Sequence, residues 1–198
     1  APARRPFQAP ALSDGDFLRD KVPMTKEEIR CLSIAKLHLR PDHTLWDVGA
    51  GTGSVSCEGA LAVNEGRVYA VERKDEAVEL LRRNREALGL SNLHIVPGLA
   101  PEALRDLPAP DRVFLGGTAG SMEEILRCAL EKNPSVRFVV NAVTLETLSE
   151  ILRCFVALGI DDTDMVQVSV TRTRKAGSYH LMDAQNPVWI VSGEVRHG

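Results

Sequence analysis

The chain has 198 residues, of which 44% are hydrophobic and 26% charged, and its formal net charge is −3. This length and composition suit one globular domain with its own core. The slightly acidic balance excludes the overall basic surface of a nucleic-acid-binding protein. We see no apolar run of membrane-spanning length and no basic-then-apolar leader, so we expect a cytoplasmic protein without a membrane partner. The four cysteines form no C-x-x-C pair, which favours buried thiols over a metal site or a disulfide.

The first residues of the chain are rich in Pro and Ala and show no periodicity. We therefore expect a linker-like segment over residues 1–14 and a single domain over residues 15–198. Because the sequence starts with Ala rather than Met, we also expect it to be a processed or excised part of a longer polypeptide.

The next segment carries the first helical pattern. Apolar positions in residues 26–39 predict a helix, with Thr25 as its N-cap and Glu28 as the capping-box partner. After Pro41 a short apolar run predicts the first strand at residues 45–48, and a helix follows the glycines behind it. Later strands are predicted at residues 67–72, 93–97, 112–115, 137–143, 165–171 and 188–195, and later helices at 75–88, 121–130 and 145–158.

This alternation of strands and helices predicts a parallel sheet covered by helices on both faces. The last two strands are joined only by a loop at residues 172–187, so they should form an antiparallel hairpin. We therefore expect an α/β fold with a seven-stranded, mostly parallel sheet and a C-terminal antiparallel hairpin.

A glycine motif between the first strand and its helix is the strongest functional signal. It reads Asp47-x-Gly49-x-Gly51-x-Gly53, and Glu72 ends the second strand about 20 residues later. Glycines let the backbone approach a ligand closely, and the helix start behind them offers free N–H groups. An acid at that interval is typical of a side chain that binds ribose hydroxyls. The competing interpretation is a generic glycine-rich turn, with Glu72 at a solvated strand end.

The details of this motif separate the possible cofactors. A dinucleotide fingerprint needs glycine at position 54, where Ser54 stands, and no phosphate-binding Gly-Lys-Ser/Thr run is present. The pattern instead resembles the S-adenosylmethionine site of class I (Rossmann-like) methyltransferases. In those enzymes the first glycines lie under the methionine part of the cofactor, and the acid binds its ribose.

The ends of the later strands should face the same site. Small residues at 98–100 would admit an adenine ring. The segment 116–120 offers almost no side chain, which suits a large flat acceptor, although a simple tight turn explains it equally well. Basic residues and His180 in the loop after the sixth strand could bind carboxylates, and individually a solvated surface position explains each of them as well.

Several segments resemble a narrower group, the decarboxylating precorrin methyltransferases of cobalamin biosynthesis. They are Pro23-Met24-Thr25-Lys26, Trp46-Asp47-x-Gly49-Ala50-Gly51-Thr52-Gly53, Phe114-Leu115-Gly116-Gly117 and Asn186-Pro187-Val188. The resemblance implies methylation of carbon-15 of a precorrin tetrapyrrole and decarboxylation of the acetate on carbon-12. It also implies a homo-oligomer, as a tetramer, and an origin as the C-terminal half of a fused enzyme whose N-terminal half methylates carbon-5.

The resemblance and the predicted sheet edge together give a set of site residues. The expected cofactor contacts are Thr25, Gly49, Ala50, Gly51, Thr52, Gly53, Glu72, Gly98 and Ala100. The expected substrate contacts are Lys26, Arg30, Gly116, Gly117, Thr118, Arg172, Arg174, Lys175 and His180. We assign no catalytic residue and no metal ligand, and a helix cap explains Thr25 as well as a cofactor contact does.

Two other functions stay open at this point. One is a class I methyltransferase that acts on RNA or on a protein side chain, and it would need a basic face or a recognition module. The other is a non-enzymatic fold that binds the cofactor without turnover.

Overall fold

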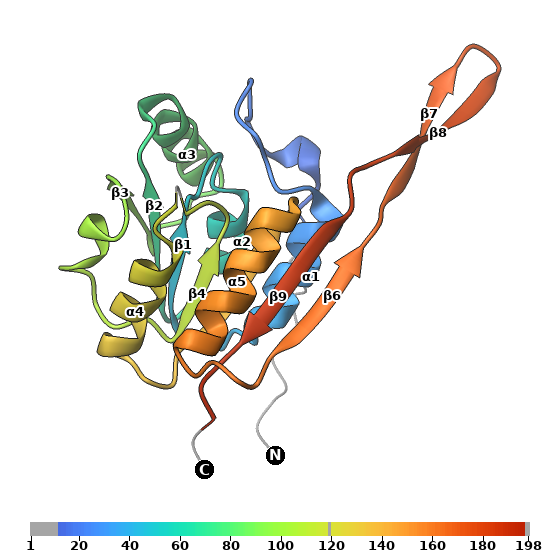
Figure 1. Ribbon diagram of the computed structural model, residues 1–198. Helices are drawn as coiled ribbons and strands as arrows, with labels where there is room; N and C mark the ends of the chain where they lie inside the picture. Colours follow the sequence, from blue (N-terminus) through green and yellow to red (C-terminus); the bar gives the residue numbers. More distant parts are fainter. Residues whose placement is uncertain (1–11, 119, 197–198) are drawn as a thin grey trace, which may run out of the picture.

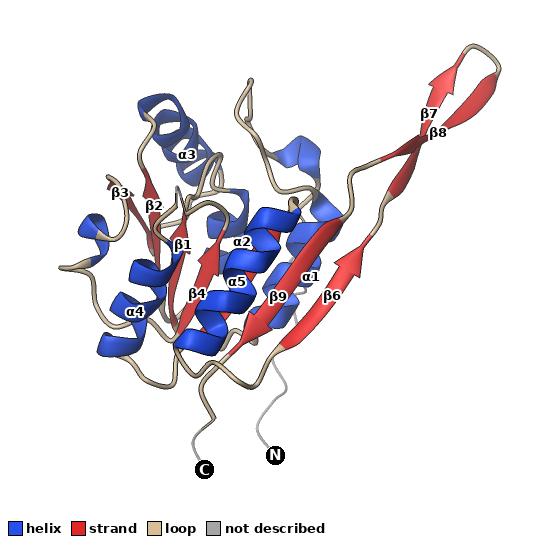
Figure 2. Cartoon of the chain, in the orientation of Figure 1, coloured by secondary structure: helices blue, strands red, loops and turns tan. Residues whose placement is uncertain are grey.

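The computed structural model describes residues 12–118 and 120–196. Most of the expected linker, residues 1–11, lies outside this range. Figure 1 and Figure 2 show a sheet with helices on both faces and a long two-stranded arm that leaves the body. Within the described residues, no helix is both long and apolar enough to cross a bilayer.

The central sheet has seven strands in the order β3-β2-β1-β4-β5-β9-β6. Its parallel part consists of β1 (Thr44–Val48), β2 (Arg67–Glu72), β3 (Leu93–Pro97), β4 (Arg112–Leu115) and β5 (Arg137–Ala142). Strand β9 (Val188–Gly193) is inserted between β5 and β6 (Asp164–Val168) and runs antiparallel to both. The expected seven-stranded, mostly parallel sheet with an antiparallel end is therefore confirmed.

Five α-helices cover the two faces of the sheet. They are α1 (Glu27–Leu37), α2 (Ser54–Ala62), α3 (Asp75–Ala87), α4 (Met122–Lys132) and α5 (Leu145–Ala157), with short 3-10 turns at η1 (Asp14–Asp16) and η2 (Glu102–Leu104). Helices α1, α2 and α3 pack on one face and α4 and α5 on the other. Neighbouring strand residues point to opposite cores, as Leu45 and Trp46 do, and both are fully buried.

The start of α1 differs from the expectation. The N-cap is Lys26 rather than Thr25, its own side chain makes no capping hydrogen bond, and Asp14 Oδ1 accepts the Glu27 N–H instead. The Thr25 carbonyl instead accepts a hydrogen bond from Arg30 Nη1 at 2.7 Å. Arg30 holds the chain before the helix in an extended path, which places Thr25 outside the first turn. The capping-box prediction was wrong.

The segment expected as a loop at residues 172–187 is a second hairpin. Strands β7 (Thr171–Ala176) and β8 (Tyr179–Ala184) pair antiparallel in a separate two-stranded sheet, and Gly177 turns between them at φ +62°. We call this hairpin the arm. Its side chains are mostly exposed, so it lacks the apolar alternation by which a strand is recognised in sequence.

Candidate active site

A cavity of about 660 Å³ opens at the carboxyl ends of the parallel strands. The loops after β1, β2, β3, β4 and β5 form its floor and inner wall. Its outer wall comes from residues 22–26, which we call the strap, and from Val170, Gln185 and Asn186, which we call the arm root. This is the edge where open α/β sheets bind ligands.

The glycine loop after β1 needs its glycines at two positions in particular. Gly49 has φ +75°, and a Cβ there would lie 2.6 Å from the carbonyl oxygen of Gly117. Gly53 has φ +79°, and a Cβ there would lie 1.9 Å from Leu81 Cδ1. The first glycine lets the loops after β1 and β4 touch, and the second lets α2 begin against α3. The chain therefore turns sharply and directs the start of α2 at the cavity.

Glu72 ends β2 at the cavity wall and is 8% exposed. Its Oε1 accepts the backbone N–H groups of Arg73 at 2.8 Å and Lys74 at 2.9 Å. Its Oε2 accepts the Gly51 N–H at 2.9 Å. The carboxylate is thus held in one orientation before any ligand arrives, and about one of its four lone-pair positions, on Oε2, stays available.

Two further polar groups at the cavity are buried without a partner among the described residues. Asp47 Oδ1 and Thr52 Oγ1 each make no hydrogen bond. The other carboxylate oxygen of Asp47, Oδ2, accepts a hydrogen bond from Ser56 Oγ. Burial raises the pKa of Asp47 to about 7, against the lowering effect of the Ser56 hydrogen bond. Buried polar atoms are normally satisfied, so this floor is suited to a ligand that brings hydrogen-bonding groups.

The structure brings most of the expected cofactor contacts together. Glu72 at the end of β2, Thr25 in the strap and the glycine loop all line the one cavity. Of the expected set, the cavity is lined by Thr25, Gly49, Ala50, Gly51, Thr52, Glu72, Gly98 and Ala100. Gly53 lies behind the lining, at the start of α2. Among the expected substrate contacts, the lining contains Lys26, Gly116, Gly117 and Thr118.

Arg30, expected to bind substrate, is placed elsewhere. Its side chain is fully buried, and its guanidinium donates to Glu58 Oε1 and to the Leu12 carbonyl. It also donates to Asp14 Oδ1 at 3.1 Å and lies over the Phe17 ring. A guanidinium enclosed in this way is not open to a ligand, so Arg30 serves the structure.

The remaining basic candidates lie on the arm and not in the cavity lining. Arg172 pairs with Glu28 and Asp14 near the arm root. Arg174, Lys175 and His180 follow further out, where Figure 1 shows the arm leaving the body. Sequence reasoning brought them to the site because it treated the arm as a loop folded over the sheet edge.

Several lining residues were missed from the sequence. The strap residue Met24, the β2 exit residue Lys74 and the arm-root residue Gln185 all line the cavity. Asn84, almost fully buried in α3, donates to the Thr52 carbonyl at 2.9 Å and to the Leu18 carbonyl at 2.8 Å. Asn84 therefore connects Leu18, in the segment before the strap, with Thr52 in the glycine loop. The sequence signals for this wall were the Pro23-Met24-Thr25-Lys26 segment and the Asn186-Pro187 pair.

The cavity fits S-adenosylmethionine in the chemistry of its donors and acceptors. Glu72 offers a preset carboxylate for ribose hydroxyls, and the small residues after β3 leave space beside it. Asp47 Oδ1 and Thr52 Oγ1 are buried polar atoms that a charged amino acid group would satisfy. The close contact of Gly49 with Gly117 leaves a floor of backbone alone.

Comparison with known proteins identifies the family of this chain. The sequence matches the family model described as a precorrin methyltransferase domain over residues 16–193. A probable cobalt-precorrin-6B C(15)-methyltransferase (decarboxylating) of Pyrobaculum calidifontis is 42% identical over 190 residues, covering 94% of this chain and 97% of that protein.

Solved structures agree as well. The crystal structure of precorrin-6y C5,15-methyltransferase from Geobacter metallireducens has a TM-score of 0.87 at 35% identity, covering 92% of this chain and 97% of that one. An O-methyltransferase from Thermotoga maritima has a TM-score of 0.75 at 18% identity, which shows the fold alone. The expected class I methyltransferase fold is confirmed, and the chain belongs to the family of precorrin methyltransferase domains.

Proposed function

We propose that this protein transfers a methyl group from S-adenosylmethionine to carbon-15 of a precorrin macrocycle and removes the carbon-12 acetate carboxyl group as carbon dioxide. The observation that supports this proposal most directly is the Glu72 carboxylate, which backbone hydrogen bonds hold in place beside the glycine loop in a chain of this family. The relative of Pyrobaculum calidifontis is named for this methylation and decarboxylation. A tRNA methyltransferase from Aquifex aeolicus is 12% identical, which supports the fold and not an RNA acceptor.

When bound, S-adenosylmethionine supplies an electrophilic methyl group on a positively charged sulfur. The chain binds and orients this donor through Glu72 and the glycine loop, and Gly116 and Gly117 leave the floor free for a flat acceptor. A conjugated ring carbon is nucleophilic by itself, so positioning can supply much of the rate. Near-attack geometry is worth roughly 7–11 kcal/mol. The conjugated imine of the macrocycle can accept the electron pair released by decarboxylation, and we assign neither step a catalytic side chain.

Within this proposal the individual contacts are as follows. The donor contacts are Thr25, Gly49, Ala50, Gly51, Thr52, Glu72, Gly98 and Ala100, with Gly53 supporting the loop. The acceptor contacts from this chain are Lys26, Gly116, Gly117 and Thr118. Arg174, Lys175 and His180 could reach a carboxylate-rich acceptor only if the arm bends or if a second copy presents them.

A product analysis tests the function. The protein is incubated with S-adenosylmethionine and candidate precorrins, and the product mass is measured. We expect a gain of one methyl group together with the loss of one carbon dioxide. Methylated RNA or protein, or donor binding without turnover on any precorrin, would refute the proposal.

We also propose that the chain forms a homotetramer in which the arm contacts a second copy. An isolated two-stranded hairpin is marginal in water, yet the arm extends away from the body. Its exposed apolar side chains include Tyr179 at 73% and Met182 at 83% exposure, which a second copy would cover.

The location and the domain organisation belong to the same proposal. We place the reaction in the cytoplasm, and the four cysteines, which lie far apart in sequence without a C-x-x-C pair, support a reducing compartment. We extend the proposal to a methyltransferase domain over residues 15–198, a linker before it and a covalently linked N-terminal methyltransferase domain. Intact mass analysis of the native protein would detect that additional domain.

A further inference from the structure

The outer wall of the cavity consists of two segments without regular secondary structure. The strap precedes α1, and the arm root lies where the chain enters and leaves the arm. A backbone hydrogen bond from the Gln185 N–H to the Val170 carbonyl, at 2.9 Å, closes the arm root. Neither segment is hydrogen-bonded into the central sheet, so side-chain contacts have a large share in setting the distance between them.

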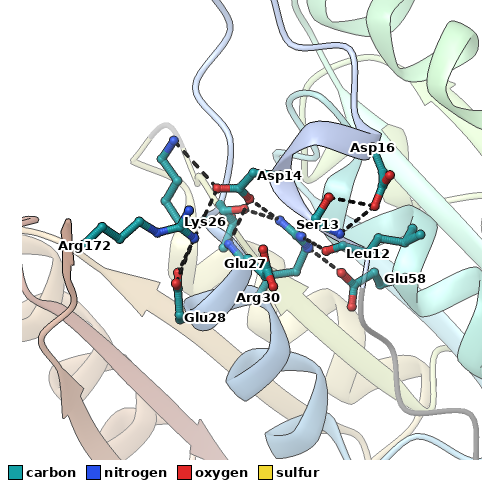
Figure 3. Close-up of polar contacts among 11 residues, drawn as sticks. Leu12, Ser13, Asp14, Asp16, Lys26, Glu27, Glu28, Arg30, Glu58 and Arg172 are labelled. Atoms are coloured by element: carbon teal, nitrogen blue, oxygen red, sulfur yellow. Dashed lines mark hydrogen bonds and ion pairs between the residues drawn. The ribbon is translucent and has the colours of Figure 1, made fainter. Parts of the chain in front are cut away.

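An ionic cluster links these two segments. Arg172, two residues beyond the arm root, donates to Glu28 in the first turn of α1 at 2.8 Å. The same Arg172 Nη2 lies 3.7 Å from Asp14 Oδ2. Asp14 accepts the Glu27 N–H at 2.9 Å, directly after the strap. Figure 3 shows Arg172 linked to Glu28 and to Asp14, and Asp14 linked in turn to Arg30, and we call Asp14, Glu28 and Arg172 the brace.

The brace differs from the neighbouring Arg30 cluster in its exposure. The side chains of Arg30 and Glu58 are both 0% exposed, so this pair is a fixed part of the core. The side chains of Glu28 and Arg172 are 40% and 39% exposed, so water and salt reach them. The hydrogen bond from Arg172 holds the pKa of Glu28 below its ordinary value, so the pair is charged at neutral pH. The brace is therefore the adjustable connection of the outer wall.

We propose that the Asp14–Glu28–Arg172 brace holds the strap and the arm root at the spacing that S-adenosylmethionine requires, and so sets the affinity of the cavity for this donor. The inference rests on the proposed function, because it assigns the cavity to that donor. The three residues touch no ligand in this scheme. They are positioning residues, and they act through the strap, which lines the cavity and whose Pro23 carbonyl oxygen would lie 3.3 Å from a Cβ on Gly51 of the glycine loop.

Calorimetric titration of S-adenosylmethionine into the full chain tests the brace. We compare the wild type with Glu28→Gln, Arg172→Gln and the double variant. Each single variant should raise the donor Kd about twofold to fivefold, because a half-exposed ion pair contributes up to about 1 kcal/mol. The double variant should bind about as weakly as the Arg172→Gln variant, because Arg172→Gln already removes both the Glu28 and the Asp14 contacts of Arg172.

A matched control separates this effect from a general loss of ion pairs. Glu123 on α4 pairs with Arg127 and Arg153 at 3.1 Å each, outside the cavity lining. Glu123→Gln should leave the donor Kd unchanged. Arg172→Lys keeps the positive charge, so its donor Kd should lie between those of the wild type and Arg172→Gln. If Arg172→Gln does not fold, Arg172→Lys and Glu28→Gln still test the brace.

Salt and hydrogen exchange give readouts that do not depend on turnover. Raising the salt from about 0.05 M to about 0.5 M should weaken donor binding by the wild type toward the level of Glu28→Gln, and should change the variant less. Amide exchange at Met24 and Thr25 should be faster in the variant without donor. Wild-type affinity in both single variants, or equal salt dependence of wild type and variant, overturns the brace. Absence of donor binding by the wild type refutes the proposed function instead.

Discussion

The Glu72 carboxylate gives the sharpest test of the donor site. Three of its lone-pair positions accept backbone N–H groups, which leaves one on Oε2 for a ribose hydroxyl without rearrangement. One hydrogen bond to a charged acceptor contributes about 1.5–3 kcal/mol. In Glu72→Gln the amide oxygen can keep the Arg73 and Lys74 contacts, but the NH₂ group then faces both the Gly51 N–H and the ribose. We therefore expect the donor Kd to rise about 10-fold to 150-fold.

The assay is calorimetric titration of S-adenosylmethionine, with thermal unfolding recorded on the same samples. The unpaired Gly51 N–H should cost about 1–3 kcal/mol of stability, so the variant is measured well below its midpoint. Glu76→Gln removes an exposed charge at the start of α3, four residues along the chain, and should leave the Kd unchanged. An unchanged Kd in Glu72→Gln, or an equal loss in Glu76→Gln, would contradict the assignment of Glu72 to the ribose.

Three further predictions concern the glycine floor, the pH dependence of stability and the arm. Gly49→Ala should unfold or inactivate the protein, because the new Cβ would lie 2.6 Å from the Gly117 carbonyl oxygen. A Cβ at Gly117 meets nothing within 4 Å, so Gly117→Ala should raise only the KM for the acceptor. The pKa of Asp47 is raised from 3.8 to about 7 in the folded protein. Between pH 3.8 and pH 7, the Asp47 carboxyl is therefore protonated in the native state and ionised in the unfolded chain. Unfolding free energy should therefore fall from about pH 5 to pH 8 by on the order of 2–3 kcal/mol, and Asp47→Asn should flatten this dependence in denaturant titrations. Replacement of Tyr179 and Met182 by Ser should lower the mass in light scattering, and an unchanged mass would remove the arm from the interface.

The central sheet and the glycine loop at its edge were predictable because their signals are local. Strands β2, β3 and β4 begin and end where apolar runs meet turns, and the glycine motif lies between a strand and a helix. Close backbone approach requires glycine wherever it occurs in a fold, so Gly49 and Gly53 carry their structural meaning in the sequence itself. Glu72 follows from its place at the next strand end.

The outer wall was not predictable for a physical reason. Whether a cation faces a ligand or a carboxylate depends on contacts between residues far apart in the chain. Arg30 meets Glu58 and Asp14, and Arg172 meets Glu28, 144 residues away in sequence. The arm carries polar residues on both faces, so its strands leave no periodic pattern. Charge alone therefore identified basic residues without identifying their partners.

The two walls of the cavity divide the chemistry between them. The donor side is built from strand ends whose backbone hydrogen bonds fix every loop, and the same fold is shared with an O-methyltransferase at 18% identity. The outer wall is formed by the strap and the arm root, which lie outside the sheet and are connected through half-exposed charges. Under the proposed function, Gly116 and Gly117 at the sheet edge also contact the acceptor, so a change of acceptor requires new sequence in the loop after β4 as well as in the strap. The glycine motif serves the donor that all class I methyltransferases share, whereas the Pro23-Met24-Thr25-Lys26 strap lies in the outer wall, and this is why the strap narrowed the family where the glycine motif did not.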